Sequence, residues 1–114
     1  MEKVSLDAVA EEQLDAARRA SAGRAAHTCV GGRDRRLRQT VLALRAGHEL
    51  AEHDNPGEAT LIVLRGRVRL DAGDVSQEGS PGDLLVIPPS RHGLVAVEDS
   101  AILLTVVVAG AADS

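Results

Sequence analysis

Short β-rich segments separated by turn residues are the feature that most constrains how this chain folds. From Arg24 onward they follow one another at close spacing, with turns such as Asn55-Pro56-Gly57 and Ser80-Pro81-Gly82 between them. Frequent short strands with regular turn signals are typical of an all-β sandwich or barrel. We expect about nine strands, over residues 24–30, 37–45, 49–53, 59–64, 67–70, 75–78, 84–87, 93–97 and 101–109.

A helix is predicted ahead of the strands, from Ser5 to about Ala20. Ser5 is a suitable N-cap, acidic residues fall early and arginines fall late, as the helix dipole favours. Gly23 is a suitable stop. The apolar stripe is narrow, so we expect the helix to pack on the outside of the barrel or on a second subunit. The chain accordingly divides into a helical extension over residues 1–23, a β-barrel domain over 24–110 and a tail over 111–114.

The composition argues against several classes of function. The chain has 114 residues, no Phe, Tyr or Trp, one cysteine and a net charge of −4. It therefore has no aromatic surface for stacking bases and no aromatic cage for cations, and its charge argues against non-specific binding to nucleic acid. Cys29 alone forms no internal disulfide, and no apolar run approaches the roughly 20 residues of a membrane helix. We expect one cytoplasmic domain with an aliphatic core and neither a nucleic-acid nor a membrane partner.

Two stretches carry spaced glycines and histidines. In the first, Gly47 is followed by five residues and His53, then Asn55, Ala59 and Gly66. This spacing resembles the first motif of the cupin family, which is Gly, five residues, His-x-His, three or four residues, Glu, six residues and Gly. Asn55 stands where the second His belongs and Ala59 stands where the Glu belongs. The spacing is complete, but two of the three metal ligands are replaced.

The second stretch resembles the second cupin motif, which is Gly, five residues, Pro-x-Gly, two residues, His, three residues and Asn. Here Gly82 is followed by five residues and Pro88, Ser90 replaces the Gly, and His92 comes one residue early. Ala96 replaces the Asn. The resemblance spans roughly residues 24–109 and is to small, mostly uncharacterised, single-domain bacterial cupins of the RmlC-like type. It implies a jelly-roll barrel (a double-stranded β-helix) whose mouth holds a divalent metal or a small ligand, and a homodimer.

The metal site is the first candidate site. His53 and His92 are its plausible ligands. Asn55 is a weak third ligand, because a neutral amide suits hard ions better than Zn or Fe. His48 could supply the missing ligand if a bulge turned it inward. A metal site needs three or four good ligands. The open choices are a divalent metal (Zn, Ni, Mn or Fe) and two histidines hydrogen-bonded at the mouth of an apolar barrel.

Strand alternation predicts which side chains face into the barrel, because residues two apart on a strand point the same way. His92 shares its parity with Leu94 and Ala96, while Arg67 and Arg69 should face water. The predicted inward set is Ala59, Leu61, Val63, Val68, Leu70, Leu84, Val86, Leu94 and Ala96, and the predicted ligand pocket is Ala59, Leu61, Val63, Val86 and Leu94.

Three further groups have simpler interpretations. Glu58 should face outward, because the six-residue count to Gly66 puts Ala59 in register. His27 and Cys29 share the parity of a metal or nucleophile pair but more often only pack. An exposed turn explains the cluster of Arg33, Arg35, Arg36 and Arg38 better than an anion site does.

Two functions follow, and the sequence does not choose between an enzyme and a non-enzyme. The first is a small-molecule-binding or sensing module with a degenerate metal site. The second is a metal enzyme, of the dioxygenase or isomerase type, that uses His53 and His92. The absent carboxylate at Ala59 favours the first, and the survival of both histidines keeps the second open.

Overall fold

One helix and nine strands make up the described part of the chain. The computed structural model describes residues 1–53 and 57–108, without the side chains of residues 52 and 53. Every predicted element is present, with ends shifted by at most one or two residues. The predicted tail over residues 111–114 lies outside the described residues. The elements are α1 (Leu6–Arg19), β1 (Arg24–Val30), β2 (Leu37–Leu44), β3 (Glu49–His53), β4 (Glu58–Arg65), β5 (Val68–Ala72), β6 (Val75–Gly79), β7 (Leu84–Val86), β8 (His92–Ala96) and β9 (Ser100–Val107).

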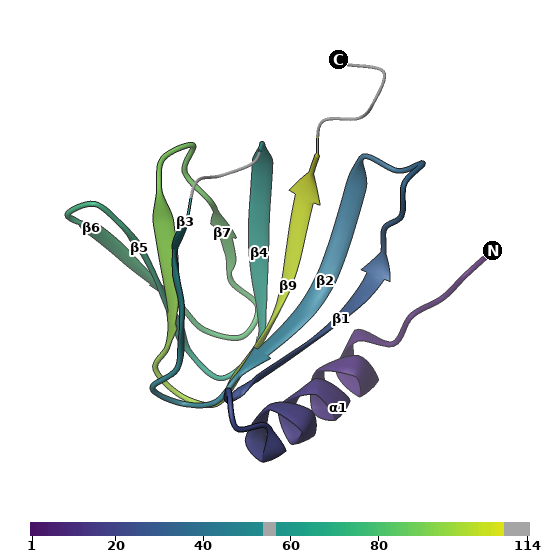
Figure 1. The fold of residues 1–114 in the computed structure, drawn as a ribbon, viewed down its shortest axis with the longest axis horizontal. Helices are drawn as coiled ribbons and strands as arrows, with labels where there is room; N and C mark the ends of the chain where they lie inside the picture. The colour runs from purple at the N-terminus through teal and green to yellow at the C-terminus, as the bar shows by residue number, and fades with distance from the viewer. Residues whose placement is uncertain (54–56, 109–114) are drawn as a thin grey trace.

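The strands form two antiparallel sheets. One sheet has the order β1-β2-β9-β4-β7 and the other has the order β3-β8-β5-β6. Figure 1 shows the four-stranded sheet standing opposite the β7–β4–β9 part of the five-stranded sheet, with β6 and β7 at one open side. The predicted all-β fold with one N-terminal helix is confirmed. In the described residues, no helix is long and apolar enough to cross a membrane.

The main core lies between the two sheets and is aliphatic throughout. Seven of the nine residues predicted to face inward are buried: Ala59, Leu61, Val63, Val68, Leu70, Leu94 and Ala96. The predicted outward orientation of Glu58 is also confirmed. Arg67 and Arg69 are half-exposed, as predicted, and Arg69 donates to Asp71 at 2.8 and 3.1 Å.

The prediction that Leu84 and Val86 face inward is wrong. Leu84 is 56% exposed and Val86 is 72% exposed. In the β4–β7 ladder, Leu85 lies opposite the buried Leu61, so Leu85 takes the inner face and its two neighbours take the outer face. Leu85 packs against the core, and Ile87 belongs to it. Because residues 84–87 are all apolar, the pattern of β7 contains no alternation that could reveal this register.

Helix α1 lies on the outer face of the five-stranded sheet, chiefly over β1 and β2, which confirms its predicted place outside the barrel (Figure 1). The Ser5 hydroxyl caps the helix by accepting from the Ala8 N–H at 3.3 Å. A second core, made mostly of small residues, lies beneath the helix. Small side chains let a helix approach a sheet closely, and the residues in this core are Ala10, Leu14 and Ala17 of α1 with Ala43 and Ala101 of the sheet.

Charged groups hold the helix at both ends. Near its start, Arg65 donates to Glu11 at 3.0 Å and to Asp7 at 3.1 Å. Near its end, Arg18 donates to Asp99 at 2.9 Å, and the other oxygen of Asp99 accepts from the backbone N–H of Ala46 at 2.8 Å. The Ala46 N–H and the Arg18 guanidinium together hold the pKa of the Asp99 carboxyl below its ordinary value.

Candidate functional site

His92 is a buried imidazole on the inner face of β8. Its exposure is 5%, and it shares that face with Leu94 and Ala96, which confirms its predicted orientation. Nδ1 lies 3.0 Å from the carbonyl oxygen of Ser90. A carbonyl only accepts, so Nδ1 carries the proton and donates, and in the neutral ring Nε2 carries the lone pair. A second hydrogen bond of this kind is how proteins orient histidines that bind metals.

His53 occupies the backbone position directly opposite His92. The two residues are Cα partners in the β3–β8 ladder. Between Leu50 and His53 the register shifts, because three steps along β3 match two steps along β8 from Leu94 to His92. This extra residue forms a β-bulge, and because of the bulge position 53 lies opposite position 92, which is on the inner face. Asn55, the weak third ligand, lies outside the described residues.

Ala59 occupies the position of the missing carboxylate. It is 8% exposed and lies in the main core with Leu61. Its carbonyl oxygen accepts from the Ile87 N–H at 3.0 Å, which ties the start of β4 to the end of β7. Metal-binding cupins carry Glu at this position. Here the position presents a methyl group to the barrel interior.

The described donors alone fall short of the ligand set of a metal ion. Among the described side chains, those of residues 1–51 and 57–108, no group of three His, Cys, Asp or Glu could hold a metal ion. Ala59 supplies no donor, and a catalytic metal site typically has three protein ligands. The two histidine positions alone fall short of that number.

His48 does not supply the missing ligand, so its predicted rescue of the site is wrong. Its Nε2 lies 3.2 Å from an Arg45 nitrogen, and its ring packs against Gly23. Its backbone carbonyl accepts from Ala96, four residues along β8 from His92. At about 3.3 Å per residue, that separation is roughly 13 Å. The turn at Ala46 and Gly47 directs His48 toward Gly23, which follows α1.

The other predicted clusters bring no further donors together. His27 is exposed, and Cys29 is the extra residue at a bulge in β1. The four clustered arginines are all exposed: Arg33, Arg35 and Arg36 lie in the turn after β1, and Arg38 lies at the start of β2.

A pocket of about 630 Å³ lies at the open side of the barrel, between the β5–β6 hairpin and β7. We call it the edge pocket. Four of the five residues predicted to line a ligand pocket are core residues that do not line it, and only Val86 does. Of the other lining residues, Leu70 and Leu84 belong to the predicted inward set. Sequence reasoning missed the rest, although alternation from Leu70 along the hairpin marks several of them. The pocket is lined by Leu70, Ala72, Val75 and Gln77, residues 83–86, Glu78 and Pro88.

Comparison with known proteins identifies the family. The model of the cupin domain matches residues 40–108, which is more than half of the chain. The chain therefore belongs to the cupin family, and its two sheets are those of the cupin jelly roll. No curated protein matches it.

Solved structures agree on the fold. A conserved protein of unknown function from Streptococcus pyogenes is 29% identical, with a TM-score of 0.71 over 81% of this chain and 80% of that one. An RmlC-like cupin from Desulfovibrio desulfuricans is 23% identical, with a TM-score of 0.64 over 94% and 91%. Salicylate 1,2-dioxygenase from Pseudaminobacter salicylatoxidans is 21% identical, with a TM-score of 0.73 over 88% of this chain and 33% of that one. The chain thus spans about a third of the dioxygenase.

Proposed function

We propose that this cupin is a non-catalytic module that binds or senses a small molecule, with a degenerate metal site. The observation that carries the proposal is the buried methyl group of Ala59 at the carboxylate position. Loss of a carboxylate removes both a donor and a negative charge that would offset the charge of a divalent ion. The chain keeps the barrel and both histidine positions, and Ala59 offers no donor where the carboxylate ligand would stand.

The alternative is a metal-dependent enzyme, of the dioxygenase or isomerase type, that uses His53 and His92. The observation that favours it is the pairing of these two positions across β3 and β8, together with the Ser90 carbonyl that orients His92. Salicylate 1,2-dioxygenase, which has a similar fold, is an example of such chemistry in another protein. The metal would be Zn, Ni, Mn or Fe.

The proposal includes a cytoplasmic homodimer. The single cysteine suits a reducing compartment. Leu37 and Val107 are cross-strand partners on the outer face of the five-stranded sheet, and both are partly exposed. An apolar pair of this kind suits an interface between two copies. Light scattering coupled to size-exclusion chromatography measures the assembly.

Metal analysis of the purified protein tests the choice between the two functions. We expect well under one equivalent of metal. The double variant Asn55→His, Ala59→Glu should then bind Zn, Ni or Mn tightly, because it rebuilds three histidines and one carboxylate. Its affinity should fall as the pH drops through about 6.5, where free histidines become protonated.

Two controls sharpen this test. Ala59→Glu alone places a carboxylate in the barrel core, so it should lower the melting temperature, and metal added to the double variant should restore it. Adding His92→Ala to the double variant should abolish the metal binding. Wild-type protein that holds one equivalent of metal, lost on His53→Ala or His92→Ala, would establish the enzyme alternative instead.

A further inference from the structure

We propose that the edge pocket binds a largely apolar small molecule that carries one hydrogen-bonding group and no negative charge. The inference rests on the proposed binding function and deepens it by naming a place and a ligand class. The pocket shares no lining residue with the site of His92 and Ala59. The metal measurements above and the probe measurements below can therefore fail separately.

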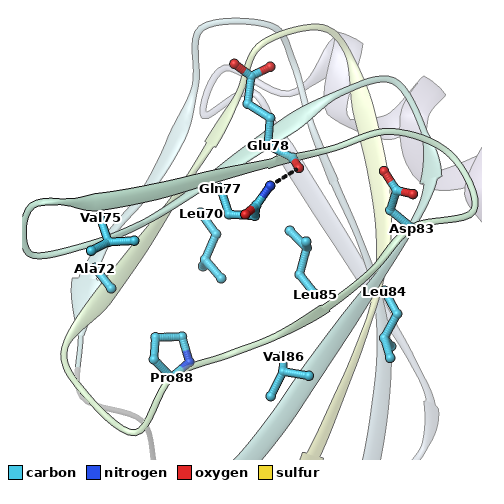
Figure 2. Close-up of a pocket in the computed structure, with 10 residues that line it drawn as sticks. All are labelled: Leu70, Ala72, Val75, Gln77, Glu78, Asp83, Leu84, Leu85, Val86 and Pro88. Carbon is cyan, nitrogen blue, oxygen red and sulfur yellow. Dashed lines mark hydrogen bonds between the residues drawn. The ribbon is translucent and has the colours of Figure 1, made fainter.

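The edge pocket opens onto side chains of the main core. In the described part of the chain, β6 pairs only with β5, and β7 pairs only with β4, so no strand pairing joins the two sheets on this side. Leu70 and Leu85, which belong to or pack against the main core, form the floor. Figure 2 shows both between the β5–β6 hairpin and the chain that runs through Val86 to Pro88. A ligand here would cover apolar surface that is continuous with the core.

The shape of the gap favours a small molecule over an added strand or a second copy. At one end the sheets converge, because a Cβ on Gly79 would lie only 3.2 Å from Leu85 and 3.1 Å from Val63. The edge pocket is therefore closed at this end and widens toward Val75 and Val86, which are both exposed. Its volume of about 630 Å³ falls within the range of small-molecule sites. β7 has three residues, a short edge for a pairing strand.

The polar groups determine the ligand class. Gln77 lies directly opposite Leu70 in the β5–β6 ladder, so its amide stands on the inner face among apolar side chains. Its Nε2 donates to the Glu78 carbonyl at 3.3 Å (Figure 2). A glutamine amide has two N–H donors and one acceptor oxygen, so it can pair with a hydroxyl, carbonyl or amide of a ligand.

Charge excludes anionic ligands. The lining contains no Lys, Arg or His. Its carboxylate is that of Asp83, because Glu78 lies opposite the outward-facing Arg69 in the β5–β6 ladder and points its own carboxylate away from the pocket (Figure 2). Asp83 accepts from the Ser80 N–H at 2.9 Å, and Glu78 lies 3.4 Å from Arg67, which does not line the pocket. An anion would lose hydration beside the like charge of Asp83 without gaining a cationic partner. A neutral ligand has no such cost.

Two fluorescent probes test the proposal on the full chain. N-phenyl-1-naphthylamine is neutral, and 8-anilinonaphthalene-1-sulfonate has nearly the same apolar body with a sulfonate. We expect saturable, one-to-one binding of the neutral probe, at least about ten-fold tighter than that of the anion, a difference of about 1.4 kcal/mol. Val75→Arg should narrow or reverse this preference. Val4→Arg, at an exposed valine ahead of α1 and away from the pocket, is the matched control and should leave both affinities unchanged.

A filling variant and a mapping measurement complete the test. Ala72→Phe should weaken the neutral probe by about ten-fold, because it occupies the pocket. If that variant does not unfold cooperatively, amide chemical shifts of the wild-type protein decide instead. The neutral probe should then shift residues 70–77 and 84–88. The proposal is overturned if the neutral probe does not bind saturably, if both probes bind with equal affinity, or if the chemical-shift changes centre on His92. It is also overturned if probe affinity falls as protein concentration rises, because a second copy of the chain would then fill the pocket.

Discussion

The two margins of the five-stranded sheet differ in how they meet solvent. At the β1–β2 margin, α1 lies across the outer face, with small residues between helix and sheet and Arg65 bound to Asp7 and Glu11 beside them. At the β7 margin no described element lies over the outer face, and Leu84 and Val86 remain exposed. One margin has a helical layer over it, and the other leaves core residues such as Leu85 bordering a pocket.

This difference separates residues that maintain the fold from residues available for binding. Beneath α1, fully buried alanines set a close helix–sheet distance that admits no larger side chain. At the β7 margin the same sheet carries large aliphatic residues with space around them. Substitutions of the same kind should therefore have large effects in the core and under the helix, and small effects at the open margin.

The largest expected effect is that of Leu61→Asp. Leu61 is 1% exposed at the centre of the core, so an unpaired carboxylate there should cost about 4 kcal/mol or more of unfolding free energy. Leu84→Asp, on the exposed face of β7, should cost roughly 0.5 kcal/mol or less, as should Arg69→Ala. Urea denaturation measures all three. Similar losses for Leu61→Asp and Leu84→Asp would mean that the β4–β7 register is wrong.

An intermediate effect is expected for Ala43→Leu beneath α1. Ala43 is fully buried between the helix and β2, so the added atoms should displace α1 and cost about 1–3 kcal/mol. Ala72→Leu at the edge pocket is the matched change and should alter stability by about 0.5 kcal/mol or less, because the pocket has room. Thermal and urea unfolding compare the two. A harmless Ala43→Leu would show that α1 packs loosely.

The smallest expected effect is that of Asp99→Asn, which weakens the link between α1 and the turn after β2. Losing the charged acceptor for Ala46 and Arg18 should cost about 1 kcal/mol near neutral pH. The pKa of Asp99 is lowered in the folded protein, so its contribution is present above the unfolded pKa of about 3.9 and is lost as pH falls through the lower folded pKa. The difference between wild type and variant should therefore shrink as the solution is acidified below about pH 4.

Urea unfolding at several pH values measures this dependence. Asp15→Asn is the control, because Asp15 contacts the same Arg18 at 3.8 Å but is far more exposed. Its effect should be close to zero, as for most exposed ion pairs. A pH-independent loss for Asp99→Asn would indicate that the hydrogen bonds matter and the charge does not.

Local pattern was enough to predict the elements and the motif positions. Turn residues and β-rich runs mark the strands, and Ser5 marks the start of the helix, because capping and turn formation depend on neighbouring residues. The motif spacing ends at Gly66, which adopts φ +75°, and a Cβ there would collide with the Asp99 carbonyl. The inward orientation of Ala59 and His92 follows from the same local alternation.

Long-range pairing decided the rest. β7 is apolar at every position, so only its pairing of Leu85 with Leu61 reveals which face is buried. The bulge that pairs His53 with His92 depends on β8, which is distant in the sequence, and His48 is directed by its contact with Gly23. The edge pocket arises where β6 and β7 end their sheets without pairing. Sheet order is a property of contacts between distant segments, and no local pattern in the chain encodes it.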